Sequence, residues 1–149
     1  MLDLEELNGR LLRMDEDDQL TLDDENKYYC YIVGGGALIL MWYISRATHD
    51  LDIINVPPSL ISLLSKYDMN TSVSAYMDSF PDDYLMCAVK IDISTQKINF
   101  YSLSLEDLVI SKLCSSRYKD IRDITSETVV SAIDWDQLAA VEQCDRSFF

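Results

Sequence analysis

Residues 28–53, the stretch that decides the fold, read YYCYIVGGGALILMWYISRATHDLDI. Aromatic and β-branched residues at 28–33 predict a strand that runs directly into three consecutive glycines. The apolar residues after the glycines predict a helix that is buried against a sheet. Residues 51–56 predict a second strand, which two prolines end. A strand, a glycine turn, a helix and a second strand in succession are typical of a sheet packed against helices.

The segments on either side of this stretch predict further helices. Leucines at near-helical spacing predict a helix over residues 2–13, followed by a solvated loop from the acidic run that begins at Asp15 to Lys27. Residues 58–67 predict a helix with a proline in its first turn. Apolar residues dominate positions 37–45, so we expect Trp42 to lie in the core.

The middle of the chain predicts more strands. Residues 73–77 are a weak strand candidate. Residues 85–93 alternate between apolar and polar side chains, and residues 98–103 pair back on them as an antiparallel hairpin. Residues 104–149 predict helices only, and we expect Trp135 to anchor the last of them.

Together these elements predict an α+β fold with a mixed sheet, flanking helices and a helical C-terminal third. With 149 residues, 48% of them hydrophobic, the chain can form one compact domain. We expect a single domain over residues 1–149. Its parts are an N-terminal helix with an acidic loop (1–27), a sheet-containing core (28–103) and a helical part (104–149).

Composition restricts the classes of function. The formal net charge of −14 disfavours general affinity for nucleic acids, because Lys and Arg normally supply that affinity. An acidic protein can still bind a triphosphate with a metal ion, since the ion brings its own positive charge. The sequence has no long apolar run, and its first residues are acidic, so we expect a soluble cytoplasmic protein without a membrane segment.

Two aspartates at the start of the second predicted strand are candidate metal ligands. Asp50 and Asp52 stand two positions apart, so both carboxylates would project from one strand face. Two such oxygen ligands suit Mg²⁺, or Mn²⁺ in its place, which also takes phosphate oxygens and water. A glycine turn before a helix admits phosphates close to backbone N–H groups. The alternative is that the glycines only form a turn and that the aspartates end a strand in solvent.

The spacing of these residues resembles a known family. The glycines, a helix and the pattern R-x-T-x-D-x-D are similar to the minimal nucleotidyltransferase fold, and within it to the toxins of bacterial toxin–antitoxin and abortive-infection systems. The matching residues are Gly35, Gly36, Ala37, Leu38, Arg46, Thr48, Asp50 and Asp52. Many nucleotidyltransferases have Gly-Ser where this chain has only glycines, so it lacks that hydroxyl.

A second stretch, LSLEDLVISKLCSSRYKDIRDI at residues 103–124, resembles a later helical motif of these toxins. The resemblance implies that Lys112 approaches the triphosphate and that Arg117 and Asp120 line or brace the cleft. The structural alternative is that these cations are helix-surface charges paired with Asp120 and Asp123, each pair contributing a few tenths of a kcal/mol, roughly.

The resemblance assigns further roles to the motif residues. Asp50, Asp52, Lys112 and Asp120 would be catalytic, and nucleotide binding would involve Gly35, Gly36, Arg46, Thr48 and Arg117. A third metal carboxylate is common in this fold, and Asp92 is the candidate, although an Asp two residues before a turn is often only a turn residue.

Two functions follow as alternatives. In the first, a metal-dependent enzyme transfers a nucleoside monophosphate from a nucleoside triphosphate to a hydroxyl of tRNA or of a protein, as a component of a toxin–antitoxin pair with a cognate antitoxin. A tRNA acceptor would need a cationic patch that joins the region of Lys112 to Lys97 or Lys90. In the second, the chain keeps the fold without turnover and acts as an interaction protein in a partner complex.

Overall fold

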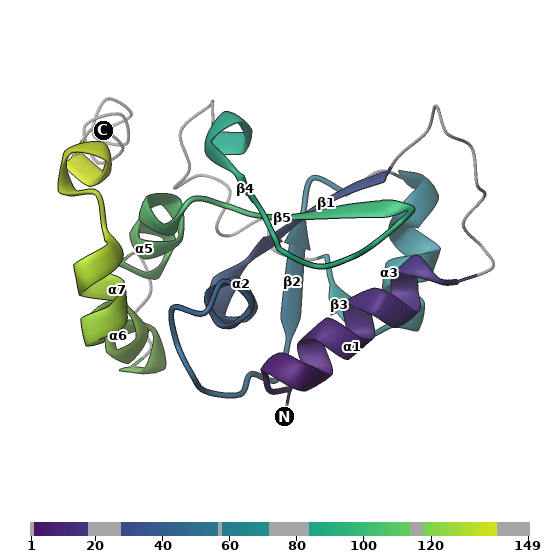
Figure 1. Ribbon diagram of the computed structural model, residues 1–149, viewed down its shortest axis with the longest axis horizontal. Helices are drawn as coiled ribbons and strands as arrows, with labels where there is room; N and C mark the ends of the chain where they lie inside the picture. The colour runs from purple at the N-terminus through teal and green to yellow at the C-terminus, as the bar shows by residue number, and fades with distance from the viewer. Residues whose placement is uncertain (1, 18–27, 57, 72–83, 114–117, 140–149) are drawn as a thin grey trace.

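The computed structural model describes residues 2–17, 28–56, 58–71, 84–113 and 118–139 (Figure 1). The strand expected at residues 73–77 lies outside this part of the chain. Within the described residues, no helix has both the length and the apolar character that crossing a bilayer requires.

A mixed sheet forms the centre of the molecule. Its described strands run in the order β3-β2-β1-β5-β4. The strands are β1 (Tyr28–Val33), β2 (Leu51–Ile54), β3 (Met69–Asn70), β4 (Val89–Lys90) and β5 (Ile98–Ser102). Strand β1 pairs in parallel with β5 and antiparallel with β2, while β3 is parallel to β2 and β4 is antiparallel to β5.

The strand predicted at 28–33 is confirmed, the one predicted at 51–56 is confirmed over Leu51–Ile54, and the hairpin is confirmed with one correction. The first hairpin strand contains only Val89–Lys90, because Tyr84–Cys87 form a 3₁₀ helix, η2. The alternation of apolar and polar residues over 85–93 therefore does not produce a strand of that length. Asp92 consequently lies beyond the end of β4.

Helices cover the sheet and extend from one end of it. They are α1 (Leu4–Asp15), α2 (Gly34–Leu40), η1 (Pro58–Leu60), α3 (Ile61–Lys66), α5 (Leu105–Leu113), α6 (Tyr118–Ile124) and α7 (Glu127–Ala132). Figure 1 shows α5, α6 and α7 gathered at one end of the molecule beside α2, with α1 and α3 toward the other. The arrangement confirms the predicted α+β class.

The acidic run that begins at the last residue of α1 is partly buried, which corrects the expectation of a solvated loop. The Asp15 carboxylate accepts hydrogen bonds of 2.8 Å from the backbone N–H groups of Gln96, Lys97 and Ile98, in the turn before β5. Asp17 is also buried, and its Oδ2 lies 2.7 Å from Lys66 Nζ. Buried carboxylates need hydrogen-bond or ion-pair partners. The partners of Asp15 and Asp17 come from distant segments, so these contacts hold the end of α1 against the rest of the fold.

Helix α2 ends earlier than expected, and its end exposes Trp42. The N–H of Trp42 donates to Ile39 O (3.1 Å), and that of Tyr43 donates to Leu38 O (2.9 Å). These bonds and the φ of +69° at Trp42 form a Schellman motif, which usually has glycine at that position. Trp42 is 76% exposed and Trp135 is exposed as well, so neither belongs to the core.

The three glycines, expected as a turn before the helix, instead form the first turn of α2, and this glycine turn brings α2 close to β2. Gly34 has a φ of +73°, and a Cβ atom there would lie 3.1 Å from Asp52 Oδ2. A Cβ atom at Gly36 would lie 2.8 Å from Leu51 Cδ1. The glycine turn is therefore required by packing against β2 and, at Gly34, by the backbone conformation.

We expect Gly34→Ala to lower the free energy of unfolding by about 1–3 kcal/mol, because alanine is strained at this φ. Gly9→Ala is the matched control. Gly9 lies inside α1, where alanine should raise the free energy of unfolding by about 0.5–1 kcal/mol. Urea denaturation of both variants at pH 7 measures the two effects, and equal effects would contradict the role assigned to Gly34.

Candidate functional site

Asp52 lies on β2, between strands β1 and β3. It pairs in register with Val33 of β1 and with Asn70 of β3. The side-chain amide of Asn70 donates to Asp52 Oδ1 at 2.9 Å. Asn70 was missed by sequence reasoning, because a two-residue strand leaves no periodic pattern. The hydrogen bond orients a carboxylate that is only partly exposed.

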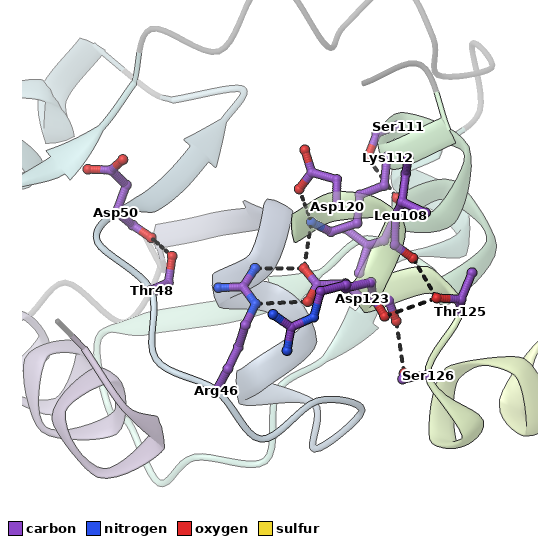
Figure 2. A network of polar contacts seen from close by, with 12 residues as sticks. Arg46, Thr48, Asp50, Leu108, Ser111, Lys112, Asp120, Asp123, Thr125 and Ser126 are labelled. Atoms are coloured by element: carbon purple, nitrogen blue, oxygen red, sulfur yellow. Dashed lines mark hydrogen bonds and ion pairs between the residues drawn. The ribbon is translucent and has the colours of Figure 1, made fainter. Parts of the chain in front are cut away.

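Asp50 precedes β2 and is not part of the strand, which corrects the prediction that both aspartates stand on one strand face. Its side chain is exposed, and Figure 2 shows the carboxylate directed away from Asp120 and Asp123. Its backbone oxygen accepts a hydrogen bond of 3.3 Å from Thr48 Oγ1. Thr48 is buried and exchanges two backbone hydrogen bonds with Leu2. The segment between α2 and β2 is therefore held in place at several points.

Arg46 fills the space that Gly35 leaves open. A Cβ atom at Gly35 would lie 2.5 Å from Arg46 Nη2. The guanidinium group makes two hydrogen bonds to Asp123, from Nε to Oδ1 (2.8 Å) and from Nη2 to Oδ2 (2.6 Å). Gly35 thus gives room to a side chain of the same motif, and its predicted contact with phosphate stays a prediction.

Lys112 of α5 is only 4% exposed and lies between two carboxylates of α6. Its Nζ is 2.6 Å from Asp120 Oδ1 and 3.0 Å from Asp123 Oδ2 (Figure 2). The alternative reading predicted these partners correctly but placed the charges on the helix surface, and that placement is wrong. An unpaired ammonium group would be costly at this depth, so the two carboxylates are required.

Arg46, Asp123, Lys112 and Asp120 form a continuous ion-pair network (Figure 2). Burial raises the pKa of Asp123, but hydrogen bonds from Arg46 and Lys112 and their positive charges outweigh burial and hold that pKa below its usual value. The hydrogen bond with Asp123 in turn raises the pKa of Arg46. Asp123 was not predicted as a site residue, because its partner Arg46 lies far away in the sequence.

The network borders a small pocket beside the glycine turn. The pocket is lined by Val33, Gly34, Gly35, Arg46, Thr48, Asp50, Asp52, Ser111, Lys112 and Asp120. Its volume is about 40 Å³, enough for an ion or a water molecule. The structure thus brings together most residues of the two sequence motifs. Gly36 packs on Leu51 instead, and Arg117 lies outside the described residues.

Comparison with known families agrees with this geometry. Over residues 9–147 the chain matches a family described as a nucleotidyltransferase of unknown function (DUF6036). The chain belongs to this nucleotidyltransferase family. No curated protein and no solved structure matches it. The family assignment confirms the resemblance to nucleotidyltransferases, while the toxin–antitoxin role stays a prediction.

The donor set of this nucleotidyltransferase suits a metal that also binds substrate. Asp50 and Asp52 line the same pocket, whereas Asp92 is exposed and does not line it. In the described part of the chain, no group of three or more His, Cys, Asp or Glu side chains is placed to hold a metal ion. One or two carboxylates, completed by phosphate oxygens and water, are the usual protein share of a Mg²⁺ site. The residues present therefore fit such an ion.

The cationic patch that a tRNA acceptor would need does not extend through Lys112. Lys112 is buried in the ion-pair network, whereas Lys90 is exposed on β4. A tRNA acceptor would need a continuous surface patch from the region of Lys112 to Lys90 or Lys97. Lys112 is too deeply buried to contribute to such a patch.

We expect Asp123→Asn to lower the free energy of unfolding by about 3–5 kcal/mol at pH 7, because it removes the charge that compensates Arg46 and Lys112. Urea denaturation measures the loss, with Glu127→Gln, at an exposed position of α7, as the matched control.

The difference between wild type and Asp123→Asn should depend on pH. The lowered pKa of Asp123 stabilises the fold above the unfolded-state pKa near 4, and this contribution is lost as the pH falls through the folded-state value. The two proteins should therefore converge in stability on acidification. A constant difference from pH 7 to pH 2 would contradict the charge argument.

Proposed function

We propose that this chain is a metal-dependent nucleotidyltransferase that moves a nucleoside monophosphate from a nucleoside triphosphate to an acceptor hydroxyl. The bond between the α-phosphorus and the bridging oxygen breaks as the acceptor oxygen bonds to that phosphorus, the hydroxyl proton passes to solvent, and pyrophosphate leaves. The observation that carries the proposal is the pocket in which the glycine turn, Asp50, Asp52 and Lys112 meet. Metal ligands and a cation beside one glycine turn are the groups that a triphosphate needs. The family assignment supports the class of reaction.

Asp50 and Asp52 are the residues that would hold the metal ion. When bound, Mg²⁺ would neutralise phosphate charge and polarise the phosphorus that the acceptor hydroxyl attacks. Asn70 keeps the Asp52 carboxylate in one orientation through its 2.9 Å hydrogen bond. The Asp50 side chain is exposed, so its carboxylate can reorient toward the pocket at little cost.

Lys112 would counter the charge of the triphosphate. Its ammonium group carries three donors, so it can contact Asp120, Asp123 and a phosphate oxygen at the same time. Asp120 positions Lys112 in this proposal, and Asp123 holds the guanidinium group of Arg46 against Gly35, where its remaining N–H groups can donate to a phosphate oxygen. These charges are fixed before substrate binds, which is the arrangement that stabilises a charged transition state most effectively.

The acceptor is tRNA or a protein, and the buried state of Lys112 together with the net charge of −14 favours a protein. A role as a toxin with a cognate antitoxin follows from the motif resemblance alone.

The pocket volume of about 40 Å³ favours one alternative, a non-catalytic interaction protein, because it is far below the roughly 300–1,000 Å³ of usual ligand sites. In the catalytic proposal most of the nucleotide lies outside this pocket.

Incubation with each α-labelled nucleoside triphosphate, Mg²⁺ or Mn²⁺, and total cellular RNA and protein tests the proposal. We expect label on one class of acceptor, and its loss in Asp52→Asn. Asp92→Asn is the matched control and should retain transfer, because Asp92 does not line the pocket. If no label is transferred and triphosphate binding is also unaffected by Asp52→Asn, the metal-site assignment is wrong and the interaction protein is favoured.

Asn70→Ala should lower metal affinity or activity by about 10–100-fold, the usual effect of removing a group that orients a metal ligand. The readout is the Mg²⁺ concentration that gives half-maximal transfer. Asn99→Ala on β5 is the control, since Asn99 does not line the pocket. An unchanged Mg²⁺ requirement in Asn70→Ala would refute the positioning role.

A further inference from the structure

A second, larger hollow also has Arg46 in its wall. It has a volume of about 870 Å³, and Arg46 and Asp123 form part of its wall. The remaining walls come from the start of α1, from residues 42–47 and from α6 and the start of α7. We call it the Trp42 groove. Its volume is within the range of ligand-binding sites, and it shares Arg46 with the smaller pocket.

The fold does not require a tryptophan at position 42. It is the left-handed residue of the Schellman motif after α2, where glycine would be free of strain. Its side chain is 76% exposed, so burial does not compensate the strained conformation. A large exposed aromatic side chain on a strained backbone position, in the lining of a groove, indicates a surface for contact with another molecule.

The charges of the groove favour a cationic partner. Asp3 and Glu5, at the start of α1, are exposed and line it. Arg122 is the exposed cation on the opposite wall, and Asp123 already neutralises Arg46. Exposed carboxylates thus exceed exposed cations here, in a chain with a net charge of −14. This field repels phosphate groups and attracts Lys and Arg side chains.

The apolar part of the groove suits the apolar portions of a partner that carries Lys or Arg side chains. Ile39, Tyr43 and Ile44 contribute to the lining beside Trp42. The face of a tryptophan ring attracts an ammonium or guanidinium group, and the methylene groups of Lys and Arg pack on apolar surface.

We propose that the Trp42 groove binds a polypeptide segment that carries basic side chains next to apolar ones, with a cation on the ring of Trp42 and paired with Asp3 or Glu5. This binding goes beyond the proposed transfer reaction, because it needs neither nucleotide nor metal. RNA is the competing class of ligand, and the experiment distinguishes the two.

Trp42→Gly is the decisive variant. It should leave the free energy of unfolding unchanged or raise it, because glycine suits the left-handed position, and it should abolish peptide binding. Asp3→Asn combined with Glu5→Gln removes two charges while Asn still caps α1 in place of Asp3, whose Oδ1 accepts from Glu6 N–H. Trp135→Ala and Glu16→Gln are the controls, since both positions are exposed and do not line the groove.

A library of random 12-residue peptides is selected on each immobilised protein without nucleotide or metal. We expect wild type, the controls and Asp52→Asn to enrich peptides with Lys or Arg beside apolar residues, and Trp42→Gly and the double variant to lose that enrichment at least tenfold. Retention by Asp52→Asn separates this result from the fate of the proposed transferase. No enrichment on wild type, or equal enrichment on Trp42→Gly, would overturn the proposal.

Tryptophan fluorescence checks the place of binding. The chain has two tryptophans, so Trp135→Phe leaves Trp42 as the sole reporter. The emission of Trp42 should change on titration with an enriched peptide and stay constant with a 12-nucleotide oligouridylate. A response to the RNA and none to the peptide would assign the groove to nucleic acid instead.

Discussion

The carboxylate of Asp123 is the contact on which the arrangement of the site depends. It binds Arg46, from the segment before β2, and Lys112, from α5, at the same time. Helices α5 and α6 are thereby held against the part of the chain that carries Asp50 and Asp52. Gly35 makes this possible, because any larger residue would displace the guanidinium group of Arg46. Two sequence motifs that are far apart in the chain thus meet through one buried anion.

The network also explains how an acidic protein can prepare a site for an anionic substrate. Its two cations and two carboxylates attract one another, which offsets the desolvation cost of burying Lys112 and partly burying Arg46. Positive charge is present at the pocket, but it is not displayed on the surface. In the proposed reaction, selection among anions would rest on short-range geometry and on the metal ion, since long-range attraction is weak in a chain with a net charge of −14.

The sequence predicted features that depend on neighbouring residues. Strand 28–33, the glycine turn and the helical C-terminal third follow from local composition, and the motif residues were found because their spacing is informative. Sequence did not predict the contacts of Asn70 and Asp15, or the contact of Asp123 with Arg46, because the partners lie far apart in the chain. Trp42 was misplaced because its apolar neighbours suggested burial, whereas the end of α2 turns it outward.

The sheet order has a consequence for the synthesis of the protein. Strand β1 is central, and its parallel partner β5 comes much later in the chain. On the ribosome, β1 is therefore complete long before β5 can cover its open edge. An unpaired, apolar edge is a template for strands of other nascent copies. The central strand β1, which pairs with Asp52 in the finished sheet, thus makes the unfinished chain prone to aggregate. Slow pairing of distant strands prolongs the time during which this edge is open.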